Sequence, residues 1–112
     1  ISNKLKFVEF FKHRRHVYHL LSAHVIPSKK FNRDKLIRLL YKKYNIKCAV
    51  QYYPLYKYDL FKKKKIGIKM INRNTEEFYN NMISFPFHIW MSGKEFNYLI
   101  LSCIKAIKEL DN

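Results

Sequence analysis

The most regular apolar pattern lies near the C-terminus and predicts a long amphipathic helix. Ser92 and Glu95 have the spacing of a capping box, and Met91 is placed to pack onto Phe96 across the cap. An apolar stripe with helical spacing follows, made of Phe96, Leu99, Ile100, Cys103, Ile104 and Ile107. We therefore expect a helix that starts near residue 93 and packs this stripe against a sheet.

A second amphipathic helix is predicted over residues 33–44. Asn32 is a favourable N-cap, and Phe31 is placed to pack onto Leu36 across it. The face expected to pack inward is formed by Leu36, Leu39, Leu40 and Tyr44. Asn45 follows as a plausible stop, because asparagine readily adopts the left-handed backbone that ends many helices.

Four segments have the composition or the alternation of β-strands. Residues 16–26 are partly β-branched or aromatic and apolar on both faces, which predicts a buried strand that Pro27 ends. Side chains alternate along residues 46–53 until Pro54, which has no N–H for a ladder. Shorter strands are predicted at residues 5–11 and 83–87.

Two short helices are predicted before the last strand. One covers residues 58–65 and is broken by Gly67; the other runs to residue 82, with Asn74 and Glu77 as its cap. This order of elements predicts an α+β fold, with a small antiparallel or mixed sheet and helices packed on one face. At 112 residues, we expect a single domain over residues 1–112.

The chain is strongly basic, with a formal net charge of +15. Such a charge favours anionic partners, namely nucleic acid, a membrane surface or phosphorylated metabolites. The chain is also rich in Lys, Asn, Ile, Tyr and Phe and poor in Gly, Ala and Pro, a bias typical of A/T-rich genomes. Selection for anion binding and genome composition therefore both remain open as explanations of the charge.

The sequence shows no targeting or membrane signal. No run of about 18 apolar residues occurs, and the first residues lack the features of a signal peptide, so we expect a cytoplasmic protein. Cys48 and Cys103 form no CxxC motif and are expected to be buried, reduced thiols, although a disulfide stays open. Because the first residue is Ile rather than Met, we expect the chain to be part of a longer product.

Taken alone, the residues predict no metal site and no complete active site. His13, His16 and His19 are three residues apart, which would place them on one face of a helix. In a strand, however, His16 and His19 point to opposite faces, so we predict that no metal binds there. No GxSxG, Walker A or GxGxxG motif and no acid–base pair occurs, so we predict no catalytic residue in this chain.

Residues 50–65, VQYYPLYKYDLFKKKK, interleave tyrosines with lysines beyond a predicted strand. Rings stack on bases and lysines attract phosphates, so this composition suits a nucleic acid or another polyanion. The run from Lys62 to Lys65 also suits a solvated surface, and no known nucleic-acid-binding signature accompanies it. The residues by themselves leave both interpretations open.

Four segments follow one another in the order and spacing of a known family. They are RHVYHLLSAHV, RDKLIRLL, NIKCAVQYYPLYKYDLFKK and NTEEFYNNMISFPFHIWMSGKEFNYLI. Together, from about Arg15 to Leu110, they resemble the C-terminal part of the DegT/DnrJ/EryC1/StrS aminotransferases. These are fold-type I, pyridoxal-phosphate enzymes that aminate keto-sugars carried on a nucleotide diphosphate. The resemblance implies a role in making lipopolysaccharide or other surface-polysaccharide sugars.

The resemblance also implies what this chain contributes. In the family, pyridoxal phosphate and its Schiff-base lysine lie mainly on a large N-terminal domain, so we expect a small domain that is inactive alone and holds no cofactor. Its expected partners are that large domain, a nucleotide-diphosphate sugar and a second copy in a homodimer, rather than nucleic acid. The alternatives are a basic module that binds nucleic acid or another polyanion, and an inactive structural remnant.

The substrate-binding residues that the resemblance implies are two tyrosines and two histidines. Tyr53 and Tyr56 come first, because they stand in a YPLY stretch that matches a YPLH-like loop near the nucleotide sugar. Tyr56 replaces a histidine that is common there, and its hydroxyl can still bond an oxygen of the ligand. His19 and His88 are further candidates, from HVYH and from the residues after SFPF.

Overall fold

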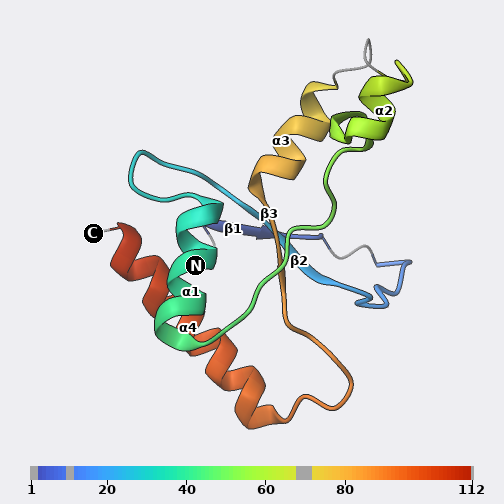
Figure 1. Ribbon diagram of the computed structural model, residues 1–112. Coiled ribbons are helices and arrows are strands. Elements are labelled where there is room, and N and C mark those ends of the chain that lie inside the picture. The colour runs from blue at the N-terminus through green and yellow to red at the C-terminus, as the bar shows by residue number, and fades with distance from the viewer. Residues whose placement is uncertain (1–2, 10–11, 68–71, 112) are drawn as a thin grey trace.

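The computed structural model describes residues 3–9, 12–67 and 72–111, which form a small α+β fold (Figure 1). Its sheet has three antiparallel strands in the order β1-β2-β3, so the predicted fold class is confirmed. The strands are β1 (Leu5–Phe7), β2 (Leu21–Val25) and β3 (Met82–Phe85). The helices are α1 (Arg33–Tyr44), the 3-10 helix η1 (Leu55–Lys57), α2 (Asp59–Lys63), α3 (Arg73–Asn81) and α4 (Gly93–Asp111).

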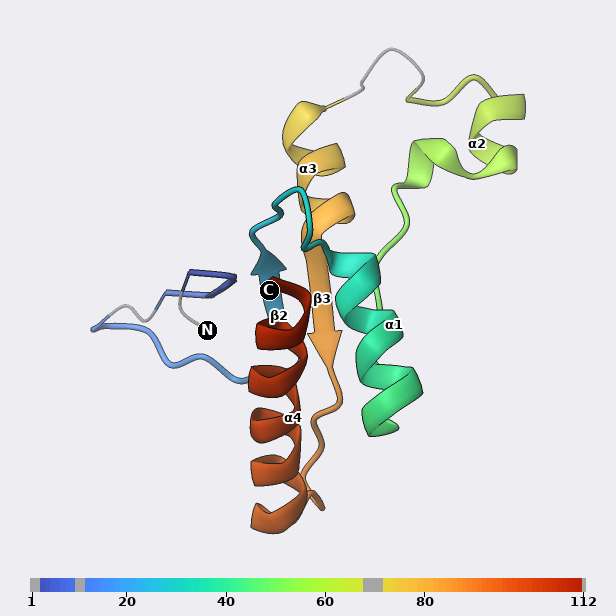
Figure 2. The ribbon, with the colours of Figure 1, turned by 90° about the vertical axis from the view of Figure 1, so that its left-hand side faces the viewer.

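The core lies between the sheet and the two longest helices. Helices α1 and α4 lie side by side over one face of β2 and β3 (Figure 2). Because Ala23 pairs with both Phe7 and Ile83, these three side chains share the sheet face that meets the helices. The fully buried side chains of this core are Val25, Phe31, Leu36, Leu40, Ile83 and Ala106.

The two predicted helices with clear caps are confirmed. The Asn32 side chain accepts a hydrogen bond from the N–H of Lys35, and Asn45 ends α1 in the left-handed conformation. At the start of α4, the Ser92 hydroxyl accepts from the N–H of Glu95, and the Glu95 carboxylate accepts from the N–H of Ser92. This reciprocal pair is a complete capping box.

The long strand predicted over residues 16–26 is wrong in its first half. Residues 21–25 form the strand, and the N–H of Ile26 also donates to the carbonyl oxygen of Lys4. By contrast, Val17 is 80% exposed and Tyr18 has a left-handed backbone. Leu21 pairs with Phe85, the last residue of β3, and the next residue is Pro86, which cannot donate to a ladder. The residues before Leu21 therefore have no continuing β3 partner, whatever their own propensity.

The strand predicted over residues 46–53 is also wrong. Ala49 exchanges two backbone hydrogen bonds with Ser84 on the free edge of β3, as an isolated bridge. The ladder stops there, because the next N–H in register, that of Gln51, donates to the Met82 sulfur at 3.1 Å instead of to a carbonyl. The chain then leaves the sheet and enters η1.

The smaller elements shift by a few residues. The strand predicted over residues 5–11 is formed as β1, which ends at Phe7; residues 10 and 11 of that prediction lie outside the described residues. The last strand starts one residue early, at Met82. The predicted helix 58–65 is formed as α2, which is shorter. The cap of α3 is Asn72, whose side chain accepts from the N–H of Asn74, so the cap predicted at Asn74 is wrong.

Both cysteines are free thiols in the structure, Cys48 partly buried and Cys103 buried. Burial raises the pKa of the Cys48 thiol to about 12 and that of Cys103 to about 11. Because the thiolate is the reacting species, we expect iodoacetamide at pH 8 to label the folded chain about a hundredfold more slowly than the urea-unfolded chain. Mass spectrometry over time measures both rates, and equal rates would contradict the prediction.

Candidate functional site

The segment that carries Tyr53 and Tyr56 lies at the end of the sheet where β3 begins, against α3. The Tyr53 ring meets the Tyr58 ring edge-on, with centroids 4.9 Å apart, and the Tyr79 ring of α3 edge-on at 5.5 Å. Edge-to-face contacts of this kind stabilise aromatic pairs beyond their burial. We call Tyr53, Tyr58 and Tyr79 the tyrosine cluster; it fixes the Tyr53 ring from two sides.

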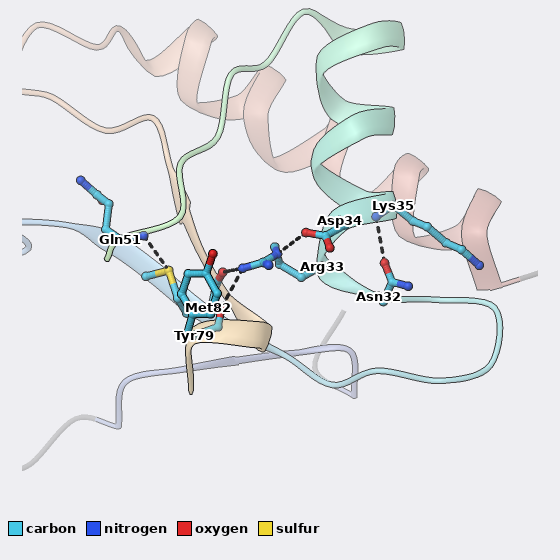
Figure 3. Close-up of polar contacts among 7 residues, drawn as sticks. All are labelled: Asn32, Arg33, Asp34, Lys35, Gln51, Tyr79 and Met82. Carbon is cyan, nitrogen blue, oxygen red and sulfur yellow. Dashed lines mark hydrogen bonds and ion pairs between the residues drawn. The ribbon is translucent and has the colours of Figure 1, made fainter. Parts of the chain in front are cut away.

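A buried arginine contacts Tyr79, the member of the tyrosine cluster that belongs to α3 (Figure 3). Arg33, at the start of α1, is 7% exposed, and its Nη1 donates to the carbonyl oxygens of Tyr79 at 2.8 Å and Met82 at 3.3 Å. Its Nε donates to the Asp34 carboxylate at 2.5 Å. The guanidinium carbon also lies 5.6 Å from the Tyr79 ring centre, within the range of a cation–π contact.

A second polar group joins η1 to α3. The Tyr56 hydroxyl donates to one oxygen of the Glu76 carboxylate, and the Lys57 ammonium contacts the other oxygen at 2.5 Å. The hydrogen bond to Glu76 raises the pKa of Tyr56 to about 12, since a tyrosinate would face a carboxylate. Hydrogen bonds from Lys57 and Tyr56 lower the pKa of Glu76 below its usual value.

The two tyrosines predicted to bind substrate therefore differ in what they offer. Tyr53 is 39% exposed as a residue. Its hydroxyl makes no hydrogen bond within the described part of the chain. The Tyr56 hydroxyl is already engaged by Glu76. Within the described residues, the Tyr53 hydroxyl is thus available to a ligand on a ring that is held in place. The Tyr56 hydroxyl must first break its hydrogen bond to Glu76 before it can bind a ligand.

Replacing Glu76 with glutamine is expected to return the pKa of Tyr56 from about 12 towards its ordinary value of 10. The change removes the negative charge that disfavours tyrosinate. Tyrosinate absorbance followed against pH, with Tyr56→Phe to assign the transition, measures the shift. Glu77→Gln is the matched control on α3, and an unchanged titration in Glu76→Gln would contradict the assignment.

The same contacts give the stability of the chain a pH dependence of known sign. Because the folded pKa of Tyr56 is raised, its contribution is present below about pH 10 and is lost as pH rises towards 12. Because the folded pKa of Glu76 is lowered, its contribution is present above the usual carboxyl range and is lost on acidification.

The two histidine candidates lie at the opposite end of the sheet. His19 precedes β2 near Leu21, which pairs with Phe85, and His88 follows the same end of β3. Both histidines are exposed, and the His88 ring lies 6.4 Å from the Trp90 ring. The structure thus separates the tyrosine and histidine candidates into two groups at the two ends of β3.

An apolar surface surrounds the histidine end. A cavity of about 360 Å³ opens there. Ile89 and Trp90, which follow His88 in the chain, are 87% and 85% exposed. Exposed apolar residues that lie together usually mark a contact surface. The cavity is lined mainly by apolar side chains, among them Phe7, Tyr18, Leu20, Leu21, Phe87 and Phe96.

The lysine run lies on the helical arm that projects from the sheet (Figures 1 and 2). Lys62 is 3.8 Å from the Asp59 carboxylate, whereas Lys63, Lys64 and Lys65 are exposed and have no ion pair with another described residue. This arm therefore presents a small, mostly unpaired positive surface.

The pyridoxal phosphate that the family resemblance implies does not fit the described residues of this chain. A Schiff-base lysine needs an enclosed, desolvated pocket. Lys6 and Lys47, which line surface hollows, are both exposed. Lys4, Lys43 and Lys57 each contact a carboxylate. We therefore assign no step of cofactor chemistry to this chain.

Two further features concern ions and membranes. Within residues 3–9, 12–67 and 72–111, no three His, Cys, Asp or Glu side chains gather as a metal ion would require. The argument from strand faces for His16 and His19 no longer applies, because residues 16–20 form no strand. Of the helices in these ranges, none combines the length and hydropathy needed to cross a bilayer.

Sequence reasoning found the Tyr53 segment but missed the residues that hold it. Arg33 lies in the first turn of α1, and a charged residue there is expected to be exposed to solvent. Tyr79 and Glu76 were placed in a short helix whose partner was unknown. The available signal was the spacing of Arg33 three residues before Leu36, which places both residues on the same face of α1.

Comparison with known proteins gives the same picture at the level of family and fold. The profile of the DegT/DnrJ/EryC1/StrS aminotransferase family matches residues 3–104. Two structures of the candidate sugar aminotransferase Spr1654 from Streptococcus pneumoniae share the fold: its PMP-form at 20% identity and TM-score 0.75, and its apo-form at 21% and 0.76. Each match covers 96% of this chain but 27% of the matched chain. No curated protein sequence matches.

Proposed function

Because this chain belongs to the DegT/DnrJ/EryC1/StrS aminotransferase family, we propose that residues 1–112 form the small domain of a pyridoxal-phosphate-dependent nucleotide-sugar aminotransferase. The observation that carries the proposal is the family match over residues 3–104. The chain spans about a quarter of the matched solved structures, 27% of their length, which fits a role as one domain of a larger enzyme.

The chemistry of amino transfer belongs to the large domain in this proposal. There, pyridoxal phosphate supplies the electron sink for moving an amino group from glutamate to a keto-sugar. This chain supplies part of the substrate cleft and of a homodimer contact. The product would be an amino sugar for lipopolysaccharide or another surface polysaccharide, made in the cytoplasm.

Tyr53 is the residue through which this chain would act on the substrate. Its hydroxyl can donate to a phosphate or sugar oxygen or accept from a sugar hydroxyl. Its ring is held edge-on by Tyr58 and Tyr79, so binding would cost little further ordering of this side chain. Tyr56 would add a second hydroxyl when the ligand displaces Glu76.

The test begins with the coding sequence upstream of Ile1. A reading frame that continues into a lysine-containing cofactor domain is expected, and the encoded protein should bind pyridoxal phosphate and aminate a nucleotide keto-sugar with glutamate as donor. A frame without such a domain, or a cofactor-loaded protein that transfers no amino group, would overturn the proposal.

In that longer enzyme, Tyr53→Phe is expected to raise the KM for the nucleotide sugar about tenfold, because one hydrogen bond to a charged or polar oxygen is lost. Steady-state kinetics measures the change. Tyr52→Phe is the matched control, since Tyr52 is 71% exposed and outside the tyrosine cluster. An equal effect of both changes would contradict a specific role of Tyr53.

The projecting arm supports a second candidate function, binding of a polyanion. Lys63, Lys64 and Lys65 are exposed beside an aromatic segment, a combination used for single-stranded nucleic acids. This reading predicts binding of a single-stranded oligonucleotide that weakens steeply with salt and is lost when the three lysines become glutamine. Absence of binding at low salt would exclude it.

A further inference from the structure

We infer that Arg33 is the positioning residue of the candidate substrate site, and that it acts on Tyr53 through Tyr79. The ligand-binding part of this inference rests on the proposed function; the positioning part rests on the geometry alone. Arg33 belongs to α1, Tyr79 to α3 and Tyr53 to the segment before η1, so one chain of contacts joins three separate parts of the fold.

The first contact ties Arg33 to the end of α3. The carbonyl oxygens of Tyr79 and Met82 lie in and just after the last turn of α3, where helix carbonyls lack partners within the helix. A cation at this end also interacts favourably with the helix dipole. The planar guanidinium reaches both oxygens from one nitrogen while its Nε holds Asp34, which fixes the guanidinium itself.

The second contact ties the Tyr79 ring to cations. The Arg33 guanidinium carbon lies 5.6 Å from the ring centre and the Lys57 ammonium 5.4 Å from it. Because Arg33 holds both the backbone and the ring of Tyr79, it limits where the ring can lie. The ring then contacts Tyr53 edge-on.

The third step concerns the weak backbone support of Tyr53. The segment leaves the sheet after the bridge of Ala49 with Ser84, and the N–H of Gln51 bonds to a sulfur. No strand ladder therefore fixes the direction of Tyr53. Its orientation depends on side-chain contacts, among them the edge-on contact with Tyr79, which Arg33 holds.

Nuclear magnetic resonance of the 112-residue chain tests the positioning. The ring signals of Tyr53, assigned by their loss in Tyr53→Phe, are expected at shifted positions because two rings face Tyr53. In Arg33→Met they should collapse towards the positions of an unpacked tyrosine, and in Arg33→Lys they should be only partly restored, since lysine lacks the planar fork. Arg38→Met, an exposed arginine of the same helix, should change nothing.

Two more variants separate positioning from simple loss of stability. Leu36→Ala weakens α1 without touching the tyrosine cluster, and at a temperature where it remains folded it should leave the Tyr53 signals in place. Tyr79→Leu keeps the backbone carbonyl but removes the ring, and it should displace the Tyr53 signals as Arg33→Met does. Unchanged Tyr53 signals in a folded Arg33→Met, or in Arg33→Lys if Arg33→Met does not fold, would overturn the inference.

The ligand arm uses UDP-glucose and dTDP-glucose as probes at millimolar concentration. Either probe is expected to shift the Tyr53 signals of the unchanged chain, with a dissociation constant about tenfold larger in Arg33→Met, because a misplaced group binds poorly. If neither probe shifts Tyr53 in the unchanged chain, Tyr53 binds no nucleotide sugar without the large domain, and the KM of Tyr53→Phe in the longer enzyme decides its role; the positioning by Arg33 is decided by the ring signals in either case. Equal dissociation constants for the unchanged chain and Arg33→Met would show that Arg33 does not contribute to binding of the probe.

Discussion

Replacing Phe31 with alanine is expected to lower the free energy of unfolding by about 3–5 kcal/mol, the usual range for a buried phenylalanine. Phe31 has no exposed surface, and it belongs to the core shared by the sheet, α1 and α4. Its backbone exchanges hydrogen bonds with Ser28, and the Lys4 ammonium lies 5.6 Å from its ring centre. The surrounding groups are therefore poorly able to move in and fill the cavity that alanine would leave.

Urea denaturation followed by circular dichroism measures this loss. A domain of this size has about 5–15 kcal/mol of stability in total, so the variant is expected to be partly unfolded at 37 °C. Phe78→Ala is the matched control, because Phe78 is 54% exposed on α3, and it should cost less than about 1 kcal/mol. Similar losses in the two variants would show that Phe31 does not anchor the core.

The helices were predictable because their signals are local. The N-cap at Asn32 and the capping box of Ser92 and Glu95 involve residues within one turn, so no knowledge of the rest of the chain was needed. The apolar stripe of α4 was right at Leu99, Cys103 and Ile107, but wrong at Ile100, which is 40% exposed, and it missed Ser102 and Ala106, which are buried. Small residues of this kind give a weak hydrophobic signal, so the buried face is turned towards Ser102 and Ala106 and away from Ile100.

The strands were predicted less well, because strand length depends on partners. Residues 16–20 and 50–53 have strand-like composition, yet neither segment has a strand beside it to pair with. Helix α3 directly precedes β3 and Pro86 directly follows it, so β3 has few backbone groups left with which another strand could pair. The sequence of one segment does not reveal how long the strand beside it will be.

The candidate site was likewise predictable only in part. A resemblance in a short stretch pointed to Tyr53 and Tyr56, but only the structure shows that Glu76 occupies the hydroxyl of Tyr56 and that the hydroxyl of Tyr53 is left uncommitted. Arg33 donates a hydrogen bond to Tyr79, which lies 46 residues further along the sequence. Composition cannot predict that the charge of Arg33 is buried. Contacts of such long sequence separation are the part of a site that a single sequence conceals.

Arg33→Met is expected to lower the free energy of unfolding by about 2–4 kcal/mol, although methionine has a similar length and is more apolar. The change leaves the carbonyl oxygens of Tyr79 and Met82 without their charged donor in a buried place, where each such loss costs about 1–3 kcal/mol. The Asp34 carboxylate is 73% exposed and returns to water, so it adds little to the loss.

Denaturation of Arg33→Met beside Arg38→Met decides whether the loss comes from the buried contacts or from removing a positive charge. With a net charge of +15, removing any one cation relieves some repulsion, so Arg38→Met should be neutral or slightly stabilising. The double variant Arg33→Met with Tyr79→Leu should lose less than the sum of the two single variants, because both changes break the same contact. Additive losses would mean that Arg33 and Tyr79 stabilise the fold independently, and the cation–π contact between them would then contribute nothing measurable.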